Sequence, residues 1–540
     1  MNKHIISLYR TITVIGLLML GACTGFFEEY NINQHQATEE MMLTDNLKSG
    51  SFFSQMQRNV VLFDEQGGGN LSSTYQVAQG LTADIYAGYY APTGTWYGGL
   101  HNGCYNFING WITQTFQSGF ERVMPAWQSI VKVANDANLP ELAALATVVK
   151  VQAMHRVADS YGPIPYINYG TGQLQNDYDS LEDVYRKFFE ELDNAIDVLT
   201  SYAANPTATI LAKYDMIYGG NVTNWVKFAN TLRLRLAMRV VEADENLAKV
   251  EAEKSAAHPF GFIAAPSERA TLKRTQIDYW HPLYDIKDFN AGEARMSAAM
   301  DSYLRGFEDP RISAYFLQVE IPHPNALTQL YRGVRLGVVT TNIMPYVGTD
   351  VSKLNVTRST EIVWMTAAES HFLRAEGALR GWQMGGTAKS FYESGIQTSF
   401  DENGVSSVDY FITDRFPASY VIPTGQGMTG AINVLSGSSS TVWSDADNFD
   451  VNLGRIITQK WIALYPDGPE AWAEYRRTGF PRLFPVVTNN SNGTINTNIQ
   501  VRRIPYPQSE YNLNAAGVQS GIVKLKGSDT GGTRLWWDIE

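Results

Sequence analysis

The first two dozen residues limit how this chain can fold, because they predict that it is exported. Lys3 and Arg10 give a positive start, and the run from Thr11 to Leu20 carries no charge. Small residues then precede a cysteine in Leu20-Gly21-Ala22-Cys23. This is the layout of a secretory signal, and its apolar core is too short to span a bilayer comfortably.

The cysteine that ends this segment predicts a lipid anchor. It is similar to a bacterial lipobox, in which cleavage after residue 22 leaves Cys23 as the N-terminus, acylated with chains such as palmitate. An ordinary signal peptide with a chance cysteine, or an uncleaved anchor, is the alternative. Two or more acyl chains hold a protein stably at a membrane. We therefore expect residues 1–22 to be removed and residues 23–540 to form one domain tethered to a membrane surface.

Cysteine usage then restricts what can stabilise the fold. Cys23 and Cys104 are the two cysteines of the sequence, so a lipidated Cys23 leaves Cys104 without a partner in the chain. An exported protein without an internal disulfide must depend on packing, which a chain of this length permits. Cys104 is predicted to be a small buried residue.

Charge excludes one broad class of function. The formal net charge is -12, and removal of Lys3 and Arg10 with the signal makes it -14. A general nucleic-acid binder needs basic surface to neutralise phosphates. Hydrophobic content of 44% and charged content of 18% are typical of a globular protein.

Three regions rich in glycine and aromatic or small polar residues interrupt the sequence that has helical periodicity, at about 65–119, 255–360 and 401–450. Such text predicts long loops, which seldom serve packing alone. Aromatic residues make up 12% of the chain. Their rings can fill a core or form flat platforms for sugars, and composition does not separate the two uses.

Between these regions, apolar residues recur at helical spacing. Pro140 begins one run, which Gly162 and Pro163 end, and Ser180 with Asp183 resembles a capping pair before the next. Further runs are predicted at 225–240, 365–379, 388–395, 457–465 and 469–477, although Leu232, Leu234 and Leu236 also alternate like a strand. The fold class expected is mainly α: tetratricopeptide-like helix pairs support a loop-rich ligand-binding half, with few short strands such as Tyr420-Val421-Ile422.

Motifs for catalysis or cofactor binding are weak. Gly425–Gly430 has dinucleotide-binding spacing, but no helix of sufficient length follows it. Asp445–Asp450 lacks the glycine and distal glutamate of a calcium loop, so a solvated acidic turn is favoured over a Ca²⁺ site. Glu470 and Glu474 lie one helical turn apart, where a solvated face is the usual explanation. We expect no enzyme and no cofactor.

Several segments in order along the chain resemble the SusD/RagB family of outer-membrane nutrient-binding lipoproteins. They are the lipobox, Tyr161-Gly162-Pro163-Ile164-Pro165, Ala367-Ala368-Glu369-Ser370, Gln459-Lys460-Trp461-Ile462-Ala463-Leu464-Tyr465 with Glu470-Ala471-Trp472, and Arg503-Ile504-Pro505-Tyr506-Pro507. Trp461, Tyr465, Trp472 and Tyr475 recur at helical spacing and are predicted to be core.

The resemblance implies a function and a partner. A non-catalytic lipoprotein at the outer membrane, facing the cell surface, would bind an oligosaccharide or polysaccharide and pass it to a SusC-like TonB-dependent transporter. The first alternative is a lipoprotein that covers the same kind of transporter as a lid but binds peptides. A helical-repeat scaffold without a small ligand and a secreted glycosidase are the others.

Family motifs do not transfer a ligand site, so we select candidates from the loop-rich regions. Aromatic rings with polar neighbours suit sugar hydroxyls and ring faces. The candidates are Tyr89, Tyr90, Trp96, Tyr97 and Asn102 from the first region, and Trp280, Tyr284 and Asn290 from the second.

Overall fold

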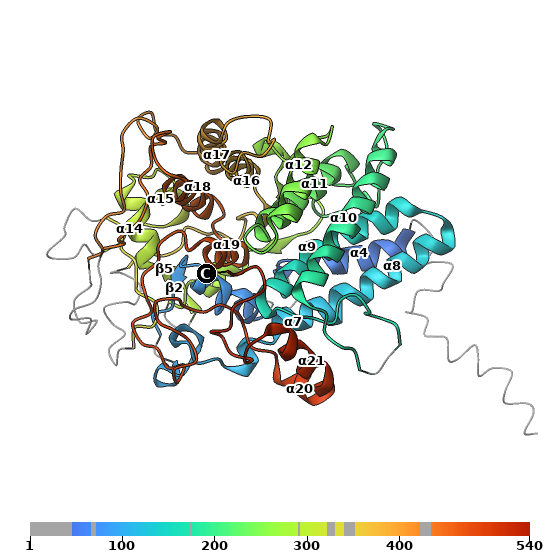
Figure 1. Ribbon diagram of the computed structural model, residues 1–540, viewed down its shortest axis with the longest axis horizontal. Helices are drawn as coiled ribbons and strands as arrows, with labels where there is room; N and C mark the ends of the chain where they lie inside the picture. Colours follow the sequence, from blue (N-terminus) through green and yellow to red (C-terminus); the bar gives the residue numbers. More distant parts are fainter. Residues whose placement is uncertain are drawn as a thin grey trace, which may run out of the picture. The chain divides into compact units, whose positions relative to one another are not determined.

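The computed structural model describes residues 46–65, 72–94, 96–172, 175–289, 292–320, 330–339, 351–421 and 434–539. The chain divides into two units, Met1–Ser51 and Phe52–Glu540, and the arrangement described below is that of the second (Figure 1). Cys23 and the expected cleavage point lie outside the described residues, as do Asn290 and Gly425–Gly430. None of the helices in the described ranges is long and apolar enough to cross a membrane.

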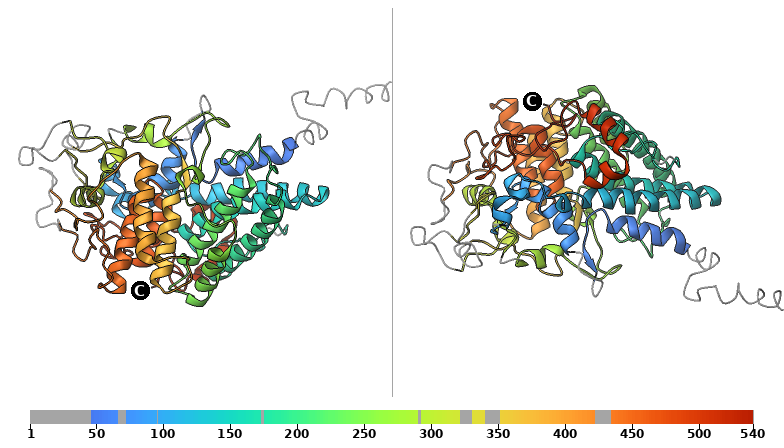
Figure 2. Two further views of the ribbon diagram at one scale, coloured as in Figure 1. Left: turned by 90° about the horizontal axis from the view of Figure 1, so that it is seen from above. Right: turned by 90° about the horizontal axis from the view of Figure 1, so that it is seen from below.

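Five successive helices form the first part of the scaffold. They are α8 (Met124–Ala137), α9 (Pro140–Tyr161), α10 (Leu181–Ala203), α11 (Val222–Arg239) and α12 (Glu245–Ala257), and each packs on the one before it. Figures 1 and 2 show them side by side. The predicted capping pair is confirmed, because the Asp183 amide donates to Ser180 Oγ at 3.1 Å. Residues 225–240 are helical and not a strand, apart from the closing Val240.

A second group of helices completes the scaffold. It consists of α16 (Ala367–Leu379), α17 (Ala388–Asn403), α18 (Phe449–Ala463) and α19 (Gly468–Thr478). α16 packs on α11, α17 and α18, and therefore joins the two groups. At its crossing with α17, a side-chain carbon added to Gly395 would lie 2.8 Å from the ring of Phe372, so a small residue is needed there. The mainly helical fold with paired helices is confirmed.

The regions predicted as loops contain short helical segments. Between residues 72 and 123 these are α5 (Ser72–Tyr75), η2 (Gln76–Gly80), α6 (Ala83–Tyr86), η3 (Trp96–Gly99), η4 (Asn102–Cys104), η5 (Asn109–Trp111), α7 (Gln114–Gln117) and η6 (Ser118–Val123). Later in the chain they are η7 (Pro266–Glu268), α13 (Pro282–Ile286), α14 (Ala298–Gly306) and α15 (Ile312–Tyr315). Helix α4 (Leu47–Arg58) precedes the first set, and α20 (Gln508–Leu513) and α21 (Ala515–Leu525) lie near the end of the chain.

Three short antiparallel ribbons tie distant segments of the chain together. β1 (Asp64–Glu65) pairs with β4 (Tyr279–Trp280), β2 (Tyr90–Ala91) with β5 (Arg295–Met296), and β3 (Ala270–Thr271) with β6 (Val363–Met365). Two of them join the first loop-rich region to the second. Tyr420 and Val421 are not in a strand, so that prediction was wrong for the two residues of the segment that are described.

A network of buried charges lies where α9, α11, α16, α18 and α19 meet. Arg477 donates to both carboxylate oxygens of Glu376 at 2.7 Å, and Arg239 joins Asp159 to Glu470. Arg235 forms a two-nitrogen contact with Glu369, and Lys460 lies 3.3 Å from Glu474. All of these side chains are at most 5% exposed.

The prediction of a solvated face for Glu470 and Glu474 was therefore wrong. Burial alone would raise the pKa of Glu470, but Arg239, Arg235 and Lys460 lower that pKa well below its usual value. The pKa of Glu474 is lowered in the same way, chiefly by Arg477. Both carboxylates are ionised partners in the core and do not meet solvent.

Candidate ligand-binding surface

Three of the predicted ligand residues are core residues, so the expectation that they contact ligand was wrong. Tyr89 is fully buried and donates its hydroxyl to the Trp461 carbonyl at 2.7 Å. The Tyr90 hydroxyl donates to Asp84 Oδ2 at 2.6 Å. The Asn102 side chain is also buried, where it donates to the Leu81 carbonyl and accepts from the Ile108 amide. The first loop-rich region packs some of its rings, Tyr89 among them, onto the scaffold through long-range contacts that local sequence does not encode.

The other two aromatic residues predicted from that region are at least partly exposed. Trp96 is partly buried and Tyr97 is 69% exposed. Trp111 completes a group of three rings: its centroid lies 5.7 Å from that of Trp96, with perpendicular planes, and 6.1 Å from that of Tyr97. We call Trp96, Tyr97 and Trp111 the Trp96 cluster. Trp111 was not among the predicted ligand residues, although it belongs to the same glycine- and aromatic-rich text.

The backbone of the Trp96 cluster has an unusual conformation. Tyr97, Gly98 and Gly99 follow one another with φ of 49°, 65° and 89°. A non-glycine residue seldom adopts positive φ, and such residues are concentrated at functional sites. A side-chain carbon at Gly99 would lie 2.8 Å from Val339, so glycine is required both by the backbone and by the space available.

A distant segment fastens this backbone. The Asn490 side chain donates to the Gly99 carbonyl at 2.8 Å, and the Asn490 amide donates to the Cys104 carbonyl at the same distance. The Cys104 side chain is buried, as predicted. The chain turn that carries Trp96 and Tyr97 is thus held from outside its own segment, and the rings are positioned before any ligand arrives.

Polar groups adjoin the rings. Asn109 belongs to the same short helix as Trp111, is exposed, and accepts from the Gln508 amide at 3.0 Å. His101 packs edge-on against Trp96, with ring centroids 5.4 Å apart, and burial lowers its pKa to about 4. A neutral imidazole at neutral pH leaves the cluster uncharged. Flat rings with amide groups and no charge suit an uncharged polar ligand such as a sugar.

The second predicted group has a different character. Trp280 and Tyr284 are both partly buried, and the Arg358 guanidinium lies 3.9 Å from the Trp280 ring centroid and 5.1 Å from that of Tyr284. We call Trp280, Tyr284 and Arg358 the Arg358 cluster. One face of the Trp280 ring is therefore already covered by a cation. In the described part of the chain, the two clusters share no ring contact, hydrogen bond or ion pair.

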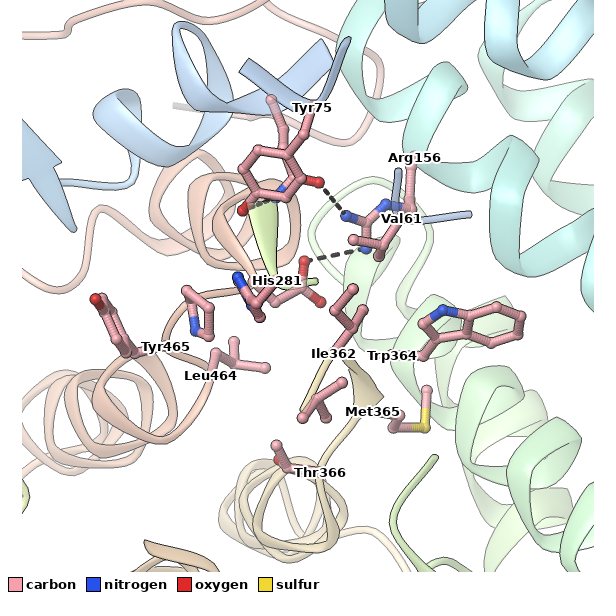
Figure 3. A pocket seen from close by; sticks show the side chains of 14 residues that line it. Val61, Tyr75, Arg156, His281, Ile362, Trp364, Met365, Thr366, Leu464 and Tyr465 are labelled. Atoms are coloured by element: carbon pink, nitrogen blue, oxygen red, sulfur yellow. Dashed lines mark hydrogen bonds and ion pairs between the residues drawn. The ribbon is translucent and has the colours of Figure 1, made fainter. Parts of the chain in front are cut away.

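A pocket lies between β6, α9 and the loop that precedes α19 (Figure 3). It is small, with a volume of about 30 Å³, and its lining includes Tyr75, Gln79, His281 and Tyr465. Arg156 and Asp467 of the lining pair with each other at 3.0 Å, and Arg156 also donates to the Gln79 side chain at 3.2 Å. Sequence reasoning missed this pocket because its residues are spread from Val61 to Asp467.

The acidic turn considered for Ca²⁺ has other partners. The Trp443 indole donates to Asp445 at 2.8 Å, and Asp447 pairs with Arg455 at 2.7 Å. Within the ranges that the structure describes, no group of three or more histidine, cysteine, aspartate or glutamate side chains is placed to hold a metal ion.

The fold and the candidate site together define a class of protein: a mainly helical scaffold whose loops carry a cluster of aromatic side chains at the surface. The chain belongs to the SusD-like family, described as Susd and RagB outer membrane lipoproteins, which matches residues 29–538. The resemblance inferred from the sequence is confirmed. A search of curated proteins found no match.

Solved structures support the same assignment. A chitin-binding SusD homolog from Flavobacterium johnsoniae is 39% identical, with a TM-score of 0.84, over 91% of this chain and 99% of its own. A SusD homolog from Bacteroides vulgatus is 35% identical, with a TM-score of 0.83, over 92% and 98%. A SusD-like protein from Bacteroides thetaiotaomicron is 32% identical, with a TM-score of 0.81, over 91% and 99%.

Proposed function

We propose that this protein captures an oligosaccharide at the cell surface and passes it to a SusC-like TonB-dependent transporter of the outer membrane. It acts as a binding protein and not as an enzyme. The protein is held at the membrane by lipid on Cys23. The observation that carries the proposal is the Trp96 cluster, three rings at least partly exposed on a fixed backbone beside the exposed Asn109 side chain.

Two further observations support a sugar as the ligand. The neutral His101 ring beside Trp96 fits a ligand recognised by ring faces and hydroxyl groups. The Flavobacterium johnsoniae relative binds chitin, which makes chitin oligosaccharides the first ligands to test. A glycosidase is disfavoured because the carboxylates considered for it, Glu470 and Glu474, are buried ion-pair partners.

The ligand is tested with residues 24–540, which lack the lipid anchor. Affinities for chitin oligosaccharides and for a panel of other glycans are measured by calorimetry, with Trp96→Ala and Trp111→Ala as variants. Each variant is expected to weaken binding about tenfold or more, which corresponds to about 1.4 kcal/mol. Phe416→Ala is the control, because Phe416 is an exposed ring outside the cluster.

Four outcomes would change the proposal. Glycan binding that survives both tryptophan variants would keep the function and move the site. Binding of peptides in place of glycans would favour the peptide-binding lid, and release of reducing ends from a glycan would favour an enzyme. A soluble region that captures only proteins would favour a scaffold.

Anchor and partner are tested in the cell. Cys23→Ala is expected to move the protein from the membrane fraction to the soluble fraction, because it removes the acylated thiol. The wild-type protein is expected to copurify with a TonB-dependent transporter from detergent-solubilised outer membrane. Recovery of the lipidated protein without any transporter would contradict the proposed delivery step.

A further inference from the structure

Arg358 is held in an unusual position for an exposed arginine. Its guanidinium stacks on the Trp280 ring at 3.9 Å and also lies 5.1 Å from the Tyr284 ring centroid. Stacking on the faces of aromatic rings is favourable for a guanidinium, and it leaves the N–H groups at the edge of the plane free to donate. The side chain is therefore fixed by contacts that use none of its hydrogen-bond donors.

The backbone beneath Arg358 is fixed as well. Its carbonyl accepts from the His281 amide at 3.1 Å and from Arg274 at 3.3 Å. The turn that carries it is closed by the Thr357 amide, which donates to Thr360 Oγ1 at 2.9 Å. Ordering a long, flexible charged side chain costs free energy when a ligand binds. Because Arg358 is already ordered in the free protein, ligand binding does not incur this cost again.

The neighbouring arginines have carboxylate partners, whereas Arg358 has none among the described side chains. Arg269 pairs with Glu361, and Arg274 pairs with Asp278 at 3.1 Å. In the same part of the molecule, Lys287 lies 4.8 Å from the Tyr284 ring and pairs with Asp288. Arg358 is thus an exposed cation that two rings hold in place.

Hydroxyl groups lie in the same turn. Thr357 Oγ1 is 3.0 Å from Ser359 Oγ and 3.2 Å from Thr360 Oγ1, and Thr357, Arg358 and Ser359 are exposed. A guanidinium fork beside hydroxyl donors matches the acceptor oxygens of a carboxylate or a sulfate. The two rings beside it supply apolar surface for the ring that bears such a group.

We propose that the Arg358 cluster binds an oxyanion carried by a sugar, either the carboxylate of an acidic sugar or a sulfate ester. Arg358 donates to the anion, Ser359 and Thr357 add hydroxyl contacts, and Tyr284 with the exposed edge of Trp280 contacts the sugar ring. The inference rests on the proposed glycan ligand for its biological meaning. It extends that function by a second subsite which prefers charged over neutral sugars.

The test follows the Nε–H resonance of Arg358 by NMR, assigned from its loss in Arg358→Gln. Glucuronate and glucose 6-sulfate are the charged probes, glucose is the neutral one, and sodium sulfate is the free anion. We expect one or both charged sugars to shift the resonance with an affinity of about 1 mM, and glucose to leave it in place. A response to glucuronate alone assigns carboxylates, and a response to glucose 6-sulfate alone assigns sulfate esters.

Two variants separate this site from its surroundings. Arg358→Lys keeps the charge but loses the planar stacked fork, so affinity for the charged sugar is expected to fall at least about fivefold. Arg269→Gln is the matched control, because Arg269 is a neighbouring arginine that pairs with Glu361 and is not used to position Arg358. It is expected to leave the affinity within twofold.

The proposal is overturned if neither charged sugar shifts the resonance, or if sodium sulfate binds as tightly as both. It is also overturned if Arg358→Gln, checked for folding by thermal melting, retains the affinity for charged sugars. These results are independent of the Trp96 cluster, whose variants are read out with neutral oligosaccharides. Failure of one site is therefore distinguishable from failure of the other.

Discussion

Tyr89 stacks on Trp461, with ring centroids 5.6 Å apart, and donates its hydroxyl to the Trp461 carbonyl at 2.7 Å. The Trp461 indole in turn donates to the Ala87 carbonyl at 2.7 Å. These contacts join the first aromatic region to α18 across most of the chain. They make Tyr89 a structural residue, whereas Tyr97, eight positions later, stands in solvent.

This relationship predicts how substitutions at Tyr89 behave. Tyr89→Ala is expected to lower the free energy of unfolding by about 3–5 kcal/mol, as for other buried aromatic residues. Tyr89→Phe loses only the hydrogen bond and is expected to cost about 1 kcal/mol. Urea denaturation measures both. If Tyr89→Phe instead weakens glycan binding tenfold at unchanged stability, Tyr89 is a ligand residue after all.

The buried charge network predicts a large contrast between two arginines. Arg477→Met removes the guanidinium that pairs with both Glu376 and Glu474 in the core, which is expected to cost about 3–5 kcal/mol although Arg380 and Lys460 remain nearby. Arg186 pairs with Glu182 and is 47% exposed, so Arg186→Met is expected to cost less than about 1 kcal/mol. Chemical denaturation of both variants tests this. Equal costs would show that the network does not stabilise the fold.

The backbone of the Trp96 cluster predicts different outcomes at two adjacent glycines. Gly98→Ala adds a carbon with nothing within 4 Å, so it is expected to cost about 1 kcal/mol from positive φ alone. Gly99→Ala places the same carbon against Val339 and Asn490, and is expected to displace the rings and weaken glycan binding several-fold. Calorimetry with the neutral oligosaccharide compares them. Equal affinities would mean that the ring positions do not depend on this turn.

The buried carboxyl group of Asp84 is expected to make the stability of the protein depend on pH. Burial raises its pKa from 3.8 to about 7, against hydrogen bonds from Tyr90, Tyr75 and Gln79 that lower it. The folded state therefore binds a proton that the unfolded state releases, and stability falls as pH rises from about 4 to about 7. The size of this effect is roughly 4 kcal/mol at most.

Asp84→Asn removes the titrating group. Its unfolding free energy, relative to that of the wild type, is expected to rise between pH 5 and pH 8. Urea midpoints at the two pH values give the comparison. A difference that does not change with pH would mean that Asp84 is ionised in the folded protein throughout this range.

The helices could be predicted because their signals are local. Pro140, Ser180 and the apolar spacing that follows each are sufficient to define α9 and α10. The environment of Glu470 and Glu474 could not be predicted from the sequence. Two residues one helical turn apart have the same spacing whether that face of the helix is exposed or buried. The partners that decide it, Arg239 and Lys460, lie on two other helices.

The candidate site could be predicted only in part, again because long-range contacts decide which residues are buried. Tyr89, Tyr90, Trp96 and Tyr97 stand in similar glycine- and aromatic-rich text, and only contacts with α18 and the buried Asp84 separate the core pair from the surface pair. Arg358 was missed because its relation to Trp280 spans 78 residues and no motif marks it. Asn290 and Cys23 lie outside the described residues and stay predictions.

The pairing of β1 with β4 and of β2 with β5 has a consequence for the order of folding. Residues 64–91 are separated by long stretches of sequence from their partners at 279–296 and at Trp461. Contacts of such long sequence separation form late, because the intervening chain must first be ordered. The aromatic surface is therefore expected to mature after the helices α8–α12, and a chain truncated before α18 would retain these helices while leaving Tyr89 exposed.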